Sequence, residues 1–472
     1  MLSKLITRQA LLAFIFLLSA CGSFQKNPPL ASYDANAGYR FAQLDQGSNS
    51  DELFIILAFS GGGTRAAALS YGVLEALRET RIRWQGREVS LLSEVDVISS
   101  ISGGSFPAAY YGLRGAKTFD EFPERFLYRP IETELMKLAL TPTNWLTLAG
   151  STFGRSDLAA AYYDREIFNG ATYQQLIAKR ERPFVILNST DMTLGTQFSF
   201  IQDQFDLLCS DLAGVPLSRA AAASSAFPGG LTPLTFANYS GSCTYQQPAW
   251  VAMAVEEHQS RENARRTARA EQRLSYTDSS PRRDFIHLID GGVADNLGLR
   301  EPLTALTSVN NSWSVLRMMN QGKVKKVAVI VVNAATDPIS HRDQTPSVPG
   351  LIDTISTAAT VPLDNFTFDT LELLRADAER NKKDALAIAG CKRLAAAKGE
   401  QCTLDIPAPQ KIDFFQIEVA FDYIQNKEER KWYKNLPTTL ELPRETVDKL
   451  RAMGKKLLNE DPQFKNLLES IP

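Results

Sequence analysis

Val95-Asp-Val-Ile-Ser-Ser-Ile-Ser-Gly-Gly-Ser105 is the stretch that decides the fold of this 472-residue chain. It begins as an apolar run of strand length, reaches Ser102, and breaks into Gly103 and Gly104, after which a helix is expected from Phe106 onward. A strand that turns into a helix through a serine and glycines is typical of a nucleophile elbow. In such a turn the strained backbone lifts one hydroxyl clear of the sheet, at the positive end of the following helix. The remaining sequence must then supply a base and an oxyanion site.

The other apolar runs predict an α/β fold. Residues 53–59 are continuously apolar, as in a parallel strand that is buried on both faces, and a glycine loop connects them to a helical pattern over residues 66–80. The pattern predicts further strands at 183–190, 196–201, 285–289, 327–332 and 414–420. Because helical patterns alternate with these strands, we predict a three-layer fold with a mainly parallel central sheet, flanking helices and helical insertions.

Changes in composition along the chain, and the positions of its glycines and prolines, suggest that it has four segments. We expect a signal peptide over residues 1–20, a lipidated N-terminus and flexible tether over 21–50, a catalytic domain over 51–335, and a mostly helical C-terminal region over 336–472 packed on the same domain. Helical insertions are expected near 117–180 and 249–283.

The first residues have the pattern of a targeting signal. Lys4 and Arg8 precede an apolar run over residues 10–18 that is too short to span a bilayer, and Leu18-Ser-Ala-Cys21 follows. This pattern resembles the bacterial lipoprotein signal, which implies a lipid on Cys21 and a lipid-anchored protein of the cell envelope. Gly22 in place of an acidic residue favours the outer membrane by the same resemblance. An ordinary signal peptide or a buried N-terminal helix are the alternatives.

The remaining cysteines and the charge narrow the chemistry further. Four cysteines in a compartment that permits disulfides allow three connectivities, of which we favour Cys209–Cys243 with Cys391–Cys402. The cysteines lack zinc-site spacing and the three histidines are scattered, so we expect no metal and no cofactor. The net charge is −2, so the chain lacks the overall excess of positive charge that is typical of nucleic-acid-binding proteins.

Gly61-Gly62-Gly63 can supply an oxyanion site. Three glycines allow backbone conformations in which adjacent N–H groups converge on one oxygen. The alternative is a phosphate-binding loop, but the dinucleotide spacing requires glycine where Ala66 stands, and no Walker lysine follows. The loop alone leaves both interpretations open.

The base can come from two places. Asp290 follows a predicted strand and precedes Gly291 and Gly292, which permit close backbone approach. It can act as a base if it lies within hydrogen-bond reach of the serine in a sheltered site. His341, which follows the strand at 327–332 by a loop, is the alternative third member of a Ser-Asp-His order. His287 lies within a predicted strand, where a satisfied core histidine is the commoner finding.

The motifs together resemble the patatin-like phospholipases, a family that includes the catalytic domain of cytosolic phospholipase A2. The marks of this family are a glycine-rich loop followed by Arg or Lys, a G-x-S-x-G elbow and a D-G-[GA] aspartate. This chain has them, in order, as Gly61-Gly-Gly-Thr-Arg65, Ser102-Gly-Gly104 and Asp290-Gly-Gly292. Two secondary blocks, Ser189-Thr-Asp-Met-Thr-Leu-Gly195 and Ser224-Ser-Ala-Phe-Pro228, lie between the last two.

The resemblance implies a serine acyl hydrolase that cleaves lipid carboxyl esters through an acyl-enzyme, with lipid and the membrane surface as its partners. Ser102 would be the nucleophile, Asp290 the only base, and the loop at Gly61–Gly63 the oxyanion hole. Arg65 would orient a substrate phosphate or brace the loop. One residue departs from the pattern, because Ser100 replaces the first glycine of the elbow. A Ser-His-Asp esterase using His341 and a non-catalytic lipid-binding envelope lipoprotein of the same fold are the alternatives.

Overall fold

The computed structural model describes residues 24–256, 264–337 and 412–471, apart from single positions at 46, 48, 51, 85, 279 and 281, together with a few residues between 338 and 411. Cys21, His341 and Cys402 lie outside the described residues, so the predictions for them stay predictions.

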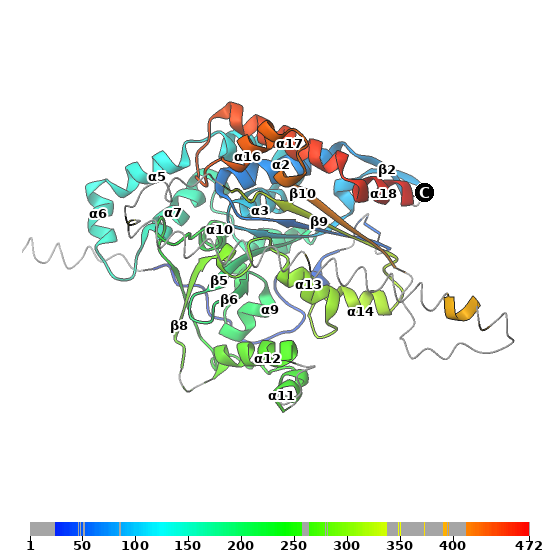
Figure 1. Ribbon diagram of the computed structural model, residues 1–472. Helices are drawn as coiled ribbons and strands as arrows, with labels where there is room; N and C mark the ends of the chain where they lie inside the picture. Colours follow the sequence, from blue (N-terminus) through cyan, green and yellow to red (C-terminus); the bar gives the residue numbers. More distant parts are fainter. Residues whose placement is uncertain are drawn as a thin grey trace, which may run out of the picture.

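An eight-stranded mixed sheet organises the molecule, with the strand order β10-β9-β1-β4-β5-β8-β7 and with β6 paired to β5 (Figure 1). Five neighbouring strands are parallel: β10 (Asp413–Ala420), β9 (Lys326–Asn333), β1 (Leu53–Phe59), β4 (Val95–Ile101) and β5 (Phe184–Asp191). Three strands are antiparallel to their neighbours: β6 (Thr196–Ser199), β7 (Leu234–Ala237) and β8 (Phe285–Asp290). The mainly parallel α/β fold predicted from the sequence is confirmed.

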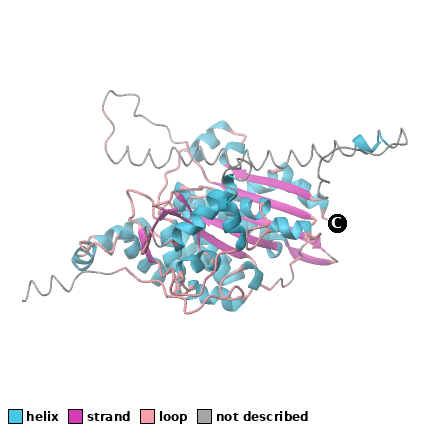
Figure 2. Cartoon of the chain, turned by 90° about the horizontal axis from the view of Figure 1, so that it is seen from below, coloured by secondary structure: helices cyan, strands magenta, loops and turns pink. Residues whose placement is uncertain are grey.

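Helices cover both faces of this sheet. Every residue of β1, β4 and β5 is buried, as in strands enclosed on two sides. β1 is apolar throughout, whereas β4 and β5 also bury polar residues. In Figure 1, α2 (Gly63–Glu79) lies above the sheet with α16 (Lys427–Lys434), α17 (Arg444–Glu460) and α18 (Pro462–Ser470), while α13 (Arg300–Thr307) and α14 (Val315–Asn320) lie below it. Figure 2, which views the molecule from below, shows the long strands side by side.

Two helical segments interrupt the α/β pattern. Between α3 (Ser105–Arg114) and β5 the chain forms α4 (Thr118–Phe122), α5 (Ile131–Ala139), α6 (Pro142–Leu148), α7 (Arg155–Tyr163) and α8 (Tyr173–Lys179). The helical insertion expected near 249–283 contains two described helices, α11 (Ala249–Glu256) and α12 (Ala264–Thr277). The shorter helices α9 (Gln202–Phe205) and α10 (Leu217–Ser224) complete the described α-helices of the core region.

Some elements were not anticipated. The hairpin of β2 (Arg81–Trp84) and β3 (Arg87–Ser90) forms a separate two-stranded sheet, and β7 extends the main sheet beyond β8. The Cys209–Cys243 disulfide predicted from the sequence is present, and Cys391 is also disulfide-bonded. Within the part of the chain that the structure describes, no helix has both the length and the apolar character to cross a bilayer.

Two glycines bring α17, the helix before the last, into close contact with α2. A Cβ on Gly72 of α2 would lie 2.1 Å from the backbone oxygen of Arg451, and one on Gly454 of α17 would lie 2.5 Å from that of Leu69. The two helix backbones therefore touch at this crossing. Because α2 begins at the glycine loop, its position depends on residues more than 370 positions further along the chain.

We expect Gly72→Ala to destabilise the protein by about 1–3 kcal/mol, because the new methyl overlaps a backbone atom that cannot move alone. A glycine-to-alanine change in an open helix position would instead stabilise by about 1 kcal/mol. Gly112→Ala in α3 is the comparison and should cost less, since the three atoms nearest to its Cβ would belong to the side chains of Val185 and Leu176, the nearest at 2.8 Å, and not to backbone. Urea unfolding measures both variants, and a Gly72→Ala protein more stable than wild type would contradict the close crossing.

Candidate active site

Ser102 sits at a strained turn between β4 and α3. Its φ of 48° lies in the left-handed region, which costs a residue with a Cβ on the order of 1 kcal/mol or more. Two hydrogen bonds stabilise the turn. The Ser102 N–H donates to the Ser224 hydroxyl at 2.9 Å, and that hydroxyl donates to the Asn188 carbonyl at 2.6 Å. The chain therefore makes a tight strand-to-helix turn at Ser102, whose side chain is 9% exposed.

Ser100, the residue that departs from the family motif, fits this turn. It is fully buried, and its hydroxyl donates to the Ile186 carbonyl of β5 at 3.2 Å. A buried hydroxyl costs free energy only when it lacks a partner. The serine therefore leaves no unpaired polar group in the elbow, although glycine is the residue of the motif.

Asp290 lies beside Ser102 because both residues flank the same part of β5. Ile101 of β4 pairs with Asn188, and Asp290 of β8 pairs with Ser189, the next residue. The sequence placed the candidate base Asp290 directly after a predicted strand, but it did not predict in which direction that strand runs in the sheet. β8 is antiparallel to β5, overlaps only its last three residues, and ends at the level of the elbow.

The Asp290 carboxylate is buried and accepts a hydrogen bond from the backbone. It is 5% exposed, accepts the Gly292 N–H at 2.8 Å, and lies close to the Ser102 side chain. Burial raises the pKa of Asp290 from its ordinary 3.8 to about 6, and the Gly292 N–H and the Ser102 hydroxyl oppose the rise. A carboxyl with a raised pKa, close to a hydroxyl, is better suited to accept a proton than a solvated aspartate.

Gly291 is required here for a steric reason. A Cβ at this position would lie 2.3 Å from the Asn188 carbonyl oxygen of β5. The backbone after Asp290 therefore passes close to β5, and this passage holds the carboxylate next to the elbow.

The glycine loop lies against the other side of the elbow. A Cβ on Gly103 would lie 2.0 Å from the Gly63 oxygen, and one on Gly61 would lie 3.3 Å from the Ser102 Cβ. Gly62 and Gly63 have φ of 135° and 59°, and α2 starts at Gly63. Among the described residues, no hydrogen bond uses the N–H of Gly62 or Gly63. Two N–H groups at the positive end of a 17-residue helix can therefore receive an anion next to the Ser102 hydroxyl.

Arg65 braces this loop instead of facing a substrate. It is 3% exposed and donates to the carbonyls of Ala334, Leu436 and Pro437 and to the Thr438 hydroxyl, at 2.7–3.0 Å. Burial lowers the pKa of Arg65 to about 10. Of the two roles considered from the sequence, the contacts favour bracing. The preceding residue, Thr64, donates its N–H to the Thr439 carbonyl at 2.8 Å, so the segment 436–439 supports the loop.

We expect Arg65→Lys to destabilise the protein by about 2–4 kcal/mol and to lower any activity at Ser102, because one ammonium cannot replace the planar set of guanidinium donors. Arg78→Lys on the same helix is the control: this arginine is exposed and only stacks on the Phe119 ring, 4.1 Å from the ring centroid, so its loss of stability should be well below that of Arg65→Lys. Urea unfolding and labelling of Ser102 by a fluorophosphonate measure the two effects. Equal stability of the two variants would contradict the bracing role.

Sequence reasoning missed two parts of this site. Ser224 was recognised only as part of a family block, yet it binds the elbow N–H and also contacts the Ser105 hydroxyl at 2.9 Å. The support from 436–439 had no sequence signal, since it joins backbone atoms to residues far away. His287 differs from the core histidine considered from the sequence: it is exposed on β8 and hydrogen-bonds the Thr235 hydroxyl at 3.1 Å.

The mixed α/β sheet with its elbow serine and glycine loop is the fold of a class of lipid hydrolases. The sequence profile of the patatin-like phospholipases matches residues 57–303, more than half of the chain, and the chain belongs to this family. A comparison with curated protein sequences gave no match.

Solved structures similar to this chain include a bacterial protein and a human phospholipase. VipD from Legionella pneumophila is 11% identical with a TM-score of 0.31, and the match covers 89% of this chain and 67% of VipD. Human GIVD cytosolic phospholipase A2 is 12% identical with a TM-score of 0.40, covering 89% of this chain and 60% of the human protein. The chain thus spans about two thirds or less of the length of these two structures.

Proposed function

We propose that the protein is a serine acyl hydrolase that cleaves carboxyl esters of membrane lipids. The observation that carries the proposal is the position of the Ser102 hydroxyl close to the buried Asp290 carboxylate, beside the N–H groups of Gly62 and Gly63, which have no hydrogen-bond partner among the described residues.

The first half of the reaction forms an acyl-enzyme. Asp290 accepts the proton of Ser102 as the serine oxygen attacks the ester carbonyl carbon, and the N–H groups of the glycine loop stabilise the negative carbonyl oxygen. The bond to the alcohol then breaks, and the proton held by Asp290 passes to the leaving alkoxide. In the second half, water gives its proton to Asp290 and attacks the acyl carbon, and Ser102 leaves with the proton returned by Asp290.

Hydrolysis of a lipid panel tests the function. Phospholipids, lysophospholipids and neutral glycerides in mixed micelles are incubated with the protein, and released fatty acid is measured. We expect at least one class to be cleaved and a fluorophosphonate probe to label Ser102, as identified by peptide mass spectrometry. If no lipid is cleaved and no label is attached, the protein is instead a lipid-binding member of the family. A His341→Ala protein that loses the label would favour the Ser-His-Asp alternative.

We propose further that the protein works at the cell envelope, held by a lipid on Cys21. The sequence from Leu18 to Cys21 is the basis of this proposal. Mass spectrometry of the N-terminal peptide from a membrane fraction tests it, and an unmodified Cys21 would contradict it.

A further inference from the structure

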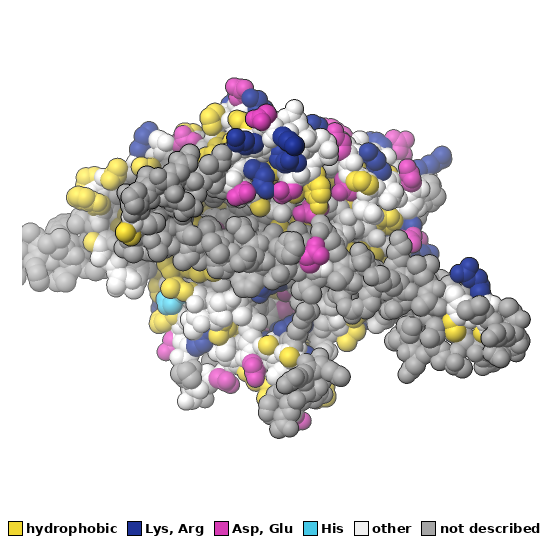
Figure 3. Space-filling view, in the orientation of Figure 1, with side chains coloured by type: hydrophobic (Ala, Val, Ile, Leu, Met, Phe, Trp, Pro, Cys, Tyr) yellow, Lys and Arg dark blue, Asp and Glu magenta, His cyan; other side chains and the backbone are white. Residues whose placement is uncertain are grey.

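The helices α5 and α6 expose large apolar side chains at one end of the molecule. Met136, Leu140 and Trp145 are 60%, 70% and 68% exposed, and Figure 3 shows hydrophobic side chains gathered at the end formed by these helices. No charged residue occurs from Leu138 to Gly154, which is unusual for an exposed segment. Contiguous exposed apolar groups of this kind mark interaction surfaces.

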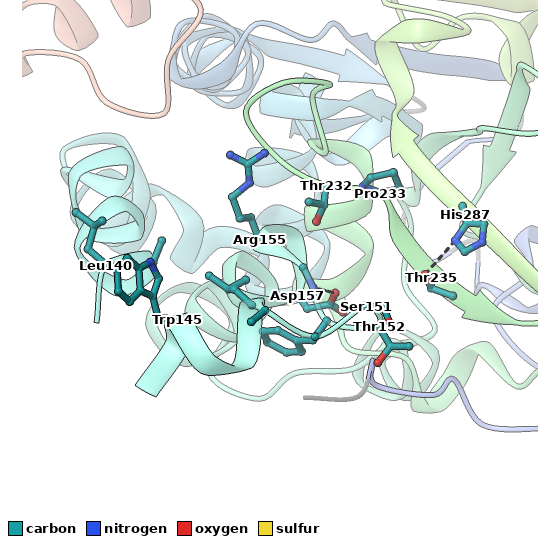
Figure 4. Close-up of a pocket in the computed structure, with 16 residues that line it drawn as sticks. Leu140, Trp145, Ser151, Thr152, Arg155, Asp157, Thr232, Pro233, Thr235 and His287 are labelled. Carbon is teal, nitrogen blue, oxygen red and sulfur yellow. Dashed lines mark hydrogen bonds between the residues drawn. The ribbon is translucent and has the colours of Figure 1, made fainter. Parts of the chain in front are cut away.

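A groove of about 970 Å³ runs beside these side chains. Leu140, Trp145, Leu148 and Phe153 line it from the helical side, and Thr235 and His287 line it from β7 and β8 (Figure 4). The groove therefore separates the apolar helices from β7 and β8, the last two strands at this end of the sheet.

The start of the described chain lies at the strand side of this groove. The Phe24 ring packs edge-to-face on Phe285, with 5.8 Å between ring centroids, and Phe285 is itself 50% exposed. Phe285 and His287 are two residues apart on β8 and share its exposed face, so they are separated by roughly 7 Å. Cys21 precedes Phe24 by three residues, which reach at most about 11 Å. A lipid on Cys21 would hold this end of the molecule against the bilayer.

We propose that the surface formed by Met136, Leu140, Trp145 and Phe285, the docking surface, inserts its apolar side chains into the headgroup region of the membrane. Tryptophan suits this depth because its ring is apolar and its N–H is polar. Lys137, the one charged residue between Met136 and Gly154, can extend its ammonium to anionic headgroups. The proposal deepens the proposed function, since it supplies the orientation in which a lipid hydrolase meets its substrate.

Quenching of tryptophan fluorescence by brominated lipid tests the docking. The full-length, lipid-modified protein is reconstituted into phosphatidylcholine vesicles whose acyl chains carry bromine, which quenches only tryptophans that reach the bilayer. We expect quenching in wild type, its loss in Trp145→Phe, and its retention in Trp432→Phe, where the replaced tryptophan is 40% exposed on α16. Leu140→Asp keeps Trp145 and should shift the docking equilibrium about tenfold or more toward the undocked form.

The outcomes separate the two proposals. A protein that is tethered without docking shows no quenching in wild type, and quenching that survives Trp145→Phe would place another face on the membrane. Either result overturns the docking surface. Because quenching needs no turnover, the result stands whether or not the protein hydrolyses lipid, and thermal melts of each variant show that the fold is retained.

Discussion

Replacing Ser102 by alanine is expected to reduce ester hydrolysis by at least about 10³-fold, because no other group can form the acyl-enzyme. The hydroxyl is held between its base and the glycine loop, and the neighbouring Ser105 hydroxyl is engaged with Ser224. Initial rates on the best lipid of the panel, with wild type as reference, measure the loss. A Ser102→Ala protein with most of the wild-type rate would exclude the proposed mechanism.

A second substitution at the same position distinguishes chemistry from structure. Ser102→Gly should be as inactive as Ser102→Ala but more stable than it, by roughly 1 kcal/mol or more, since glycine adopts a φ of 48° without steric cost. Thermal melting of the two inactive proteins tests this. Equal melting temperatures would mean that the elbow stores no backbone strain.

The elements that were predictable from the sequence are those that local patterns encode. The run at 53–59 is apolar throughout and the run at 95–101 is mostly apolar, and each is followed by a serine and then a glycine. Their burial and their turns therefore follow from a few neighbouring residues. The three motifs around Ser102, Gly62 and Asp290 were found in the same way, and the structure brings them together.

The direction of β8 could not be predicted, because the residue pattern of a strand does not show whether it pairs parallel or antiparallel to its neighbour. Its alternation of exposed and buried residues, with Phe285 and His287 outward, is the pattern of a half-covered strand near the sheet edge. The partners of Arg65 could not be predicted either. All four are at least 269 residues away in the sequence, and three of them are backbone carbonyls, which the identity of their residues does not reveal. Long-range backbone contacts of this kind complete the site, and only the folded chain specifies them.

Asp290→Asn is expected to lower the hydrolysis rate by about 10³-fold and at the same time to stabilise the protein at alkaline pH. The amide keeps the size of the carboxylate and can still accept the Gly292 N–H, but it cannot take a proton from Ser102. Wild-type hydrolysis should likewise fall as pH decreases through about 6, the pKa of Asp290, because the protonated carboxyl is no base.

The stability effect follows from the sign of the pKa change. Because the folded state raises the pKa of Asp290 from 3.8 to about 6, the folded protein binds this proton more tightly than the unfolded chain does. The stability that the proton supplies is complete below pH 4 and is lost as pH rises through 6, which amounts to roughly 2–3 kcal/mol. Asparagine carries no charge at any pH, so the advantage of Asp290→Asn in unfolding free energy should be small at pH 4 and largest at pH 8. Urea unfolding at the two pH values measures it, and an advantage that shrinks with rising pH would show that the carboxylate is stabilised, not strained, in its buried position.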